Sequence, residues 1–198
     1  MSEVKTNKLT AATGTAITLG DSGDTFTVPS GATLAVASGG TITNSGTQTG
    51  FGLFSSYAII ADQKAQNTQG GTFTSGAWRT RDLQTEIADP DTIVSISSNQ
   101  FTLGAGTYLI KWAAPTYGVG DQQARLYNVT DSAVASVGMS SYASQAWIST
   151  GSARVTIAGS KAFSIEHRCQ STYATGFGYE ANFSSTEQYT IVEIYKET

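Results

Sequence analysis

The chain has little of what many proteins use to build catalytic or metal sites. Among its 198 residues are one histidine, one cysteine and three prolines, and only 13% of the residues are charged, against about 25% in an average soluble domain. The lone cysteine, Cys169, cannot form an internal disulfide, and it excludes a zinc site built from several cysteines. A single free thiol is compatible with assembly in a reducing compartment.

Basic clusters and long apolar runs are missing too. The net charge is −4 and the lysines and arginines are dispersed, so no basic stripe is available to neutralise nucleic-acid phosphates. The longest apolar runs, such as residues 57–61, are far too short to cross a bilayer, and the polar start over residues 1–5 is unlike a secretory signal. We therefore expect a soluble protein that binds no nucleic acid, does not insert into a membrane and is not exported by the usual route.

The residues that are abundant favour β-structure. The chain has 21 glycines and is rich in Ser, Thr and Ala, with scattered β-branched residues, a mixture typical of short strands joined by tight turns. No long stretch places apolar residues at the three- and four-residue spacing of an amphipathic helix. The composition predicts an all-β protein.

A short repeat occupies residues 15–46. Each unit has an apolar, a small and an apolar residue followed by a Ser-Gly pair, and its leading apolar residues are Ile17, Phe26, Leu34 and Ile42. A fixed short period indicates stacked units that cannot bury their apolar faces alone. One strand and one turn cannot close a coil within a single chain, but three chains could each supply one side of a triangular rung, with these four side chains at its axis. The alternative is a Ser/Thr/Gly-rich linker with accidental periodicity.

The repeat ends where a glycine-rich segment, residues 48–54, breaks the period. We therefore expect three regions: an attachment segment over residues 1–12, a trimeric β-stalk over residues 13–50, and a head over residues 51–198.

In the head, runs of β-formers alternate with turn clusters, as in an antiparallel sandwich. About nine strands in this length predict a jelly roll. The last strand is apolar on both faces, so we expect Tyr189, Ile191 and Ile194 to form the trimer interface. The expected strands are residues 56–61, 80–87, 92–96, 107–116, 123–129, 133–139, 153–158, 162–170 and 188–195.

Several motifs in this order give a family resemblance. They are residues 76–83, 105–112, 123–128, 176–178 and 187–191, together with the N-terminal residues 6–9 and 20–23. On these motifs the head resembles the complement C-one-q and tumour-necrosis-factor-like superfamily, in the version found on phage tail fibres. The resemblance covers nearly the whole chain. It implies a homotrimer assembled in the bacterial cytoplasm and located in the tail of a virion, where the N-terminus would dock onto a tail or hub protein and the head would attach to a host-cell surface.

The superfamily topology implies that alternate connections lie at the two ends of the head. The short connections at residues 128–132 and 159–161 would be basal, and the longer ones at residues 117–122, 140–151 and 171–186 would be distal. Long loops on a rigid scaffold often carry binding sites, and aromatic side chains in them can stack on a glycan or anchor a protein receptor. The candidates for receptor binding are Tyr117, Asp121, Tyr142, Trp147, Tyr173 and Tyr179.

Each candidate has a structural alternative. The aromatic residues could instead pack the loops onto the head or pack between subunits. Asp121 could contribute to a ring of three carboxylates that holds Ca²⁺ near a three-fold axis, or it could be a solvated turn residue. We expect Arg81 and Arg125, which lie in strand motifs, to form structural ion pairs.

No catalytic signature is apparent, and we expect neither an enzyme nor a cofactor. His167 and Cys169 share one face of a strand about 7 Å apart, which is not a nucleophile–base arrangement; we expect His167 to be partly buried with one hydrogen bond. Asp89 and Asp91 flank a proline, which is ordinary turn chemistry. The leading interpretation is therefore a receptor-binding tail fibre. The alternatives are a structural or decorative fibre whose head caps the stalk and, less favoured, a polysaccharide-degrading spike.

Overall fold

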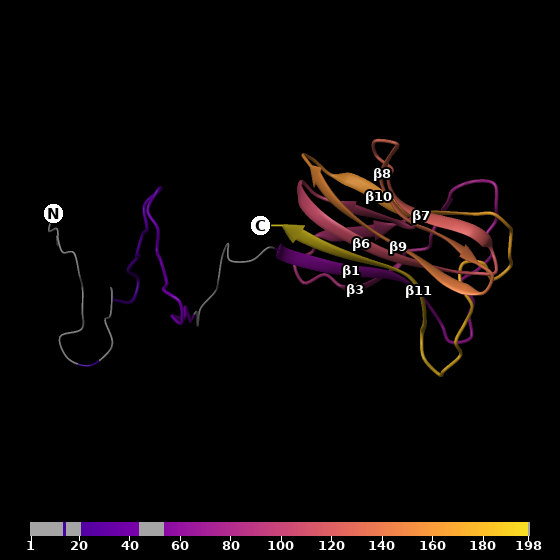
Figure 1. The fold of residues 1–198 in the computed structure, drawn as a ribbon, viewed down its shortest axis with the longest axis horizontal. Helices are drawn as coiled ribbons and strands as arrows, with labels where there is room; N and C mark the ends of the chain where they lie inside the picture. The colour runs from indigo at the N-terminus through magenta and orange to yellow at the C-terminus, as the bar shows by residue number, and fades with distance from the viewer. Residues whose placement is uncertain (1–13, 15–20, 44–53, 198) are drawn as a thin grey trace. The chain divides into compact units, whose positions relative to one another are not determined.

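The computed structural model describes residue 14, residues 21–43 and residues 54–197. The chain divides into two units, residues 1–48 and 49–198, and each is treated by itself (Figure 1). Ile17, one of the four expected axis residues, lies outside the described residues.

The repeat region contains a series of equivalent turns. Ser22-Gly23, Ser30-Gly31 and Ser38-Gly39 each form the centre of a four-residue turn, closed by hydrogen bonds of 2.9–3.0 Å between backbone groups three residues apart. The glycines have φ angles of 96°, 82° and 83°, values that the third position of a type II turn requires and that glycine adopts without strain. The periodic Ser-Gly pairs are thus turns, as predicted.

The segments between these turns have no strand partner within residues 21–43. Three of the expected axis residues are described, and Phe26, Leu34 and Ile42 are 66%, 63% and 63% exposed. A single chain therefore leaves the apolar side of the repeat uncovered. That is what the triangular-rung interpretation requires of one chain, and the interpretation itself stays a prediction.

The head is built from antiparallel strands only. The strands are β1 (Phe54–Lys64), β2 (Arg79–Thr80), β3 (Thr85–Ala88), β4 (Val94–Ser97), β5 (Gln100–Leu103), β6 (Gly106–Tyr117), β7 (Gly120–Asn128), β8 (Ala133–Ala143), β9 (Ala146–Ile157), β10 (Lys161–Cys169) and β11 (Glu187–Glu197). No helix in the described residues is long and apolar enough to span a membrane.

Two sheets form a sandwich, with the strand orders β3-β1-β11-β6-β9 and β4-β5-β10-β7-β8. Strands that follow one another in the chain cross repeatedly from one sheet to the other, as in the Greek-key winding of a jelly roll. The head is therefore a jelly roll, as predicted. Figure 1 shows the two layers, with β1, β11 and β6 in one layer and β10, β7 and β8 in the other.

The core lies between the sheets. Alternate residues of each strand point inward, so Ile110 and Trp112 of β6 meet Leu126 of β7 and Phe163 and Ile165 of β10. At 25 cal/mol per Å² this apolar burial is the main stabilising term of the head.

The two ends of the head follow from the strand register. Phe54 and Glu197 are paired, so the described part of the head begins and ends at the same end. We call the opposite end the tip. Tyr117 is paired with Ala146, and Lys64 with Glu187, so the β6–β7 and β8–β9 turns, the β10–β11 loop and the loop over residues 65–78 all lie at the tip.

Two of the three expected long tip loops are tight turns. β6 and β7 are joined through Gly118 and Val119, and β8 and β9 through Ser144 and Gln145. Only the β10–β11 loop is long. The expected strand over residues 80–87 is also wrong, because it is two strands, β2 and β3, that pair with different sheets.

The expected trimer interface needs correction at two residues. Ile194 is completely buried in the core and Tyr189 is only 6% exposed, so neither side chain is free to contact a second subunit. Ile191 lies on the face of β11 opposite to that of Ile194 and is partly exposed. The apolar residues of this strand serve mainly the core of one head.

Candidate functional site

Three of the predicted receptor-binding residues meet at the tip. Tyr117 ends β6, and Tyr173 and Tyr179 come from the β10–β11 loop; the ring centroid of Tyr117 is 5.8 Å from that of Tyr173 and 5.0 Å from that of Tyr179. The Tyr117 hydroxyl donates to Oε1 of Gln145 in the β8–β9 turn, at 3.2 Å. We call these three residues the tyrosine cluster.

The β6–β7 turn allows this cluster to form. Gly118 has a φ of 65°, and a Cβ at this position would lie 3.5 Å from the Tyr173 ring. That distance is an ordinary van der Waals contact, so it is the backbone angle that favours glycine here.

The other three candidates lie in strands. Tyr142 of β8 is 64% exposed and Trp147 of β9 is 54% exposed, while Asp121 of β7 is paired with Tyr142 and is also exposed. Tyr142 and Trp147 were expected in a loop. They belong instead to the two edge strands, β8 and β9, near the tip.

A carboxylate holds the long β10–β11 loop in shape. Glu187 accepts hydrogen bonds from the backbone N–H groups of Ala181 and Asn182, both at 2.9 Å, and from that of Asn67 at 3.3 Å. These bonds to the ionised form lower the pKa of Glu187, since protonation would remove an acceptor. One side chain therefore ties two tip loops to the start of β11.

This loop presents an apolar side chain that the sequence interpretation missed. Phe183 is 84% exposed and stands between Asn182 and Ser184, whose φ angles of 55° and 60° lie in the left-handed region. Such angles are uncommon outside glycine and occur often at functional turns. The sequence signal that could have indicated this exposed turn is Asn182 next to Phe183 in a Ser-rich segment.

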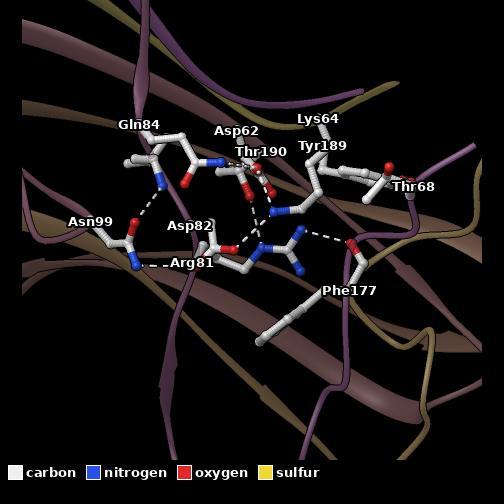
Figure 2. Close-up of polar contacts among 11 residues, drawn as sticks. Asp62, Lys64, Thr68, Arg81, Asp82, Gln84, Asn99, Phe177, Tyr189 and Thr190 are labelled. Atoms are coloured by element: carbon white, nitrogen blue, oxygen red, sulfur yellow. Dashed lines mark hydrogen bonds and ion pairs between the residues drawn. The ribbon is translucent and has the colours of Figure 1, made fainter. Parts of the chain in front are cut away.

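Behind the tip a buried arginine lies beside Phe177, which packs against a small apolar cluster of Phe73, Val119, Ala143 and Cys169. Arg81 is completely buried; its Nε donates to Thr190 Oγ1 at 2.7 Å and its Nη2 to the Phe177 carbonyl at 2.8 Å (Figure 2). Its guanidinium carbon lies 4.3 Å from the centroid of the Phe177 ring. Burial lowers the pKa of Arg81 to about 10, so the group stays charged at neutral pH.

The expected ion pair of Arg81 is therefore wrong, because its direct partners are neutral. The nearby carboxylates of Asp62 and Asp82 instead each lie 3.0 Å from Nζ of Lys64 (Figure 2). Arg125 does form the expected ion pair, 2.6 Å from Glu166.

His167 and Cys169 both point into this interior. His167 is completely buried, not partly buried as expected, and one ring nitrogen is bonded to Gln122. Burial and the nearby Arg81 lower the pKa of His167, while burial raises the pKa of the Cys169 thiol to about 11. A neutral imidazole beside a protonated thiol is the opposite of an activated nucleophile.

The described residues contain no group of three or more His, Cys, Asp or Glu side chains that could hold a metal ion. Asp89 accepts hydrogen bonds from the backbone N–H groups of Ile93 and Val94 at 2.8 and 2.9 Å. This is the turn chemistry that the sequence predicts for it.

An apolar surface follows β8 and β9. Each of these strands is one edge of its sheet, and beside them a groove of about 630 Å³ is lined in part by Trp112, Thr150 and Ile191. We call their exposed apolar side chains the edge patch: Val134, Val137, Met139, Tyr142, Trp147 and Ile148.

Comparisons with known proteins give structural likeness only. No protein-family model matches the sequence, and no curated protein matches it. The chain is similar to the globular domain of zebrafish complement 1qA protein (TM-score 0.44, 11% identity, covering 71% of this chain and 95% of that chain). It is also similar to murine APRIL (TM-score 0.46, 6% identity, 71% and 98%) and to the PRD1 vertex protein P5 (TM-score 0.43, 14% identity, 74% and 100%). The likeness is one of fold.

Proposed function

We propose that this chain is the subunit of a homotrimeric virion fibre, of the phage tail type, whose head attaches to a host-cell surface. The main support for this proposal comes from the tip, where the tyrosine cluster and the Phe183 turn lie at the end of the head opposite Phe54. Aromatic side chains supply much contact area for little loss of conformational entropy. The first and last described residues of the head, Phe54 and Glu197, both lie at the end opposite the tip.

Two exposed apolar surfaces support the homotrimer. The side chains of the edge patch and of the repeat residues Phe26, Leu34 and Ile42 are uncovered in one chain, and so many large exposed apolar side chains on two strands and one short repeat favour burial against another chain. A contact between the edge patch of one head and the outward face of β6 and β11 of the next is heterologous, and such contacts form rings when the rotation closes. In this arrangement Ile191 would lie in the interface.

Attachment can be tested with the purified full-length protein on a panel of bacterial strains. The test variant is Tyr173→Ala/Tyr179→Ala. The control is Tyr57→Ala, because Tyr57 is as exposed as Tyr173, 44% in each case, but lies near the other end of the head.

Binding of the wild-type protein and the control, with loss of binding by the double variant at unchanged mass and melting temperature, would support an attachment tip. If a well-folded wild-type trimer binds no strain, the attachment function is contradicted and the structural fibre is favoured.

A further inference from the structure

A polar groove lies near the tip, on the outer face of the sheet that contains β10, β7 and β8. Its volume is about 630 Å³, within the range of small-molecule sites. Its lining includes Gly76, Trp78, Asp121, Gln123, Arg168 and Gln170. Only Asp121 was among the residues singled out from the sequence.

The strand register gathers the polar side chains of this groove. Asp121 and Gln123 are alternate residues of β7 and so share a face, and Arg168 of β10 is paired with Gln123. Gln170 is fixed beside them, because its Oε1 accepts from the Asp121 N–H at 3.2 Å and its own N–H donates to the Asp121 carbonyl at 2.8 Å.

Two charged groups in the groove have no protein partner. Within residues 54–197, the Asp121 carboxylate and the Arg168 guanidinium make neither a hydrogen bond nor an ion pair. The first is an acceptor and the second a donor with fixed planar geometry. Because their charges are opposite, the groove as a whole has little net charge from this pair.

The aromatic wall of the groove is held rigidly. The guanidinium carbon of Arg125 lies 4.1 Å from the centroid of the Trp78 ring and 4.9 Å from that of the Tyr127 ring. Arg125 is held in turn by Glu166, to which its Nε donates at 2.8 Å. A cation that contacts both rings and is paired with a carboxylate helps to hold the position of the half-buried indole.

We infer that this groove binds a neutral sugar unit of a cell-surface polysaccharide. Asp121 accepts from one hydroxyl and Arg168 donates to a neighbouring one. Nε2 of Gln123 already donates to the Gly138 carbonyl at 3.0 Å and Oε1 of Gln170 already accepts from Asp121, so Gln123 contributes mainly an acceptor and Gln170 mainly a donor. The indole of Trp78 supplies an apolar surface for the C–H groups of the sugar ring. A hydroxyl-rich ligand satisfies this lining better than an apolar protein side chain, which would leave both charges desolvated and unpaired. The inference rests on the proposed attachment function and adds a ligand class and a second contact region.

The test is binding of the full-length protein to an array of defined neutral and acidic oligosaccharides, with Asp121→Asn and Arg168→Gln as test variants. The control is Arg154→Gln, which removes another exposed arginine, one that pairs with Glu197 in the other half of the head. We expect the wild type and the control to bind some of the neutral glycans. Each test variant should bind them roughly tenfold more weakly, the effect of losing one charge-assisted hydrogen bond.

Binding of no glycan, or binding that neither test variant weakens, would overturn the inference. To separate this from failure of attachment itself, the strains of the attachment test are treated with periodate, which cleaves vicinal diols, or with protease. Attachment that survives periodate and is lost after protease would retain the proposed function and overturn the glycan inference. Attachment that is lost only after periodate supports both.

Discussion

At the residue scale, the buried arginine behind the tip is costly to bury, because its charge must be stabilised without water. Arg81 is buried, and two hydrogen bonds and the Phe177 ring stabilise its charge, while its Nη1 has no hydrogen-bond partner among the described residues. The residue was prominent in a strand motif of the sequence. Its partners could not be predicted, because Thr190 and Phe177 lie about 100 residues away in the chain.

We predict that Arg81→Met destabilises the head by about 3 kcal/mol, because it removes two charge-assisted hydrogen bonds and leaves the Phe177 carbonyl and the Thr190 hydroxyl without this donor. Urea unfolding at a fixed protein concentration measures the effect, since assembly makes apparent stability depend on concentration. Arg154→Gln, which breaks a solvent-exposed ion pair, should change stability far less. Equal effects of the two variants would contradict the structural role of Arg81.

A second prediction concerns pH and Glu187. Its pKa is lowered from 4.5 in the folded head, so the stabilisation that it gives to the tip loops is fully present above pH 4.5 and is lost as the pH falls through the folded-state value. As the pH falls through the folded-state pKa of Glu187, we expect hydrogen exchange at the Ala181 and Asn182 amides to accelerate relative to core amides such as that of Ile194.

Glu187→Gln provides the matched variant, because it keeps the shape of the side chain and removes the charge. It should show faster exchange at these amides already at neutral pH, with a weaker dependence on acid. If the wild type and this variant have the same pH profile, the carboxylate does not hold the loop.

At the scale of the elements, the sequence predicts a strand best where that strand is buried on one face. The inward residues Phe163 and Ile165 of β10 alternate with polar ones, and the expected and observed strands agree within one residue. β5 was missed because it has only four residues, and because Ser98 and Asn99 form its turn with φ angles of 53° and 62° without a glycine.

The edge strands were misjudged for another physical reason. Residues 140–151 were expected to be a long connection between the strands over residues 133–139 and 153–158. In the structure they are mostly the ends of β8 and β9, whose side chains lie at the margins of the two sheets. Consequently Tyr142 and Trp147 do not join the tyrosine cluster, although they lie near the same end of the head.

We predict that the edge patch mediates assembly. Met139→Asp places a charge where an apolar side chain that is 68% exposed now lies, and it should convert the trimer to monomers because an unpaired charge in an interface is costly to desolvate. Phe183→Asp, at a residue that is still more exposed but lies in the β10–β11 loop, should leave the trimer intact. Light scattering at micromolar concentration distinguishes the two, and a trimeric Met139→Asp variant would place the interface elsewhere.

At the scale of the whole molecule, separate observations on the repeat region and on the head support the proposed homotrimer. The three Ser-Gly turns recur every eight residues. Each interval between them leaves two apolar residues uncovered, Phe26 with Val28 and Leu34 with Val36, and the head leaves exposed apolar side chains along β8 and β9. Only the turns could be derived from the sequence in detail, because a type II turn is set by local chemistry. Burial of Phe26 and Leu34 depends on other chains, which a single sequence does not contain.

We therefore predict that Phe26→Asp and Leu34→Asp prevent formation of a protease-resistant repeat region and leave assembly of the head unchanged. Three carboxylates at one level of a narrow axis would repel one another and lose their hydration, whereas the edge patch is unaltered. Thr27→Asp is the matched control, since successive residues of an extended segment point to opposite sides. Limited proteolysis followed by mass spectrometry reports the repeat region, and light scattering reports the head. Resistance of the Phe26→Asp protein equal to that of the Thr27→Asp protein would show that Phe26 does not face an axis, and it would leave assembly to rest on the head alone.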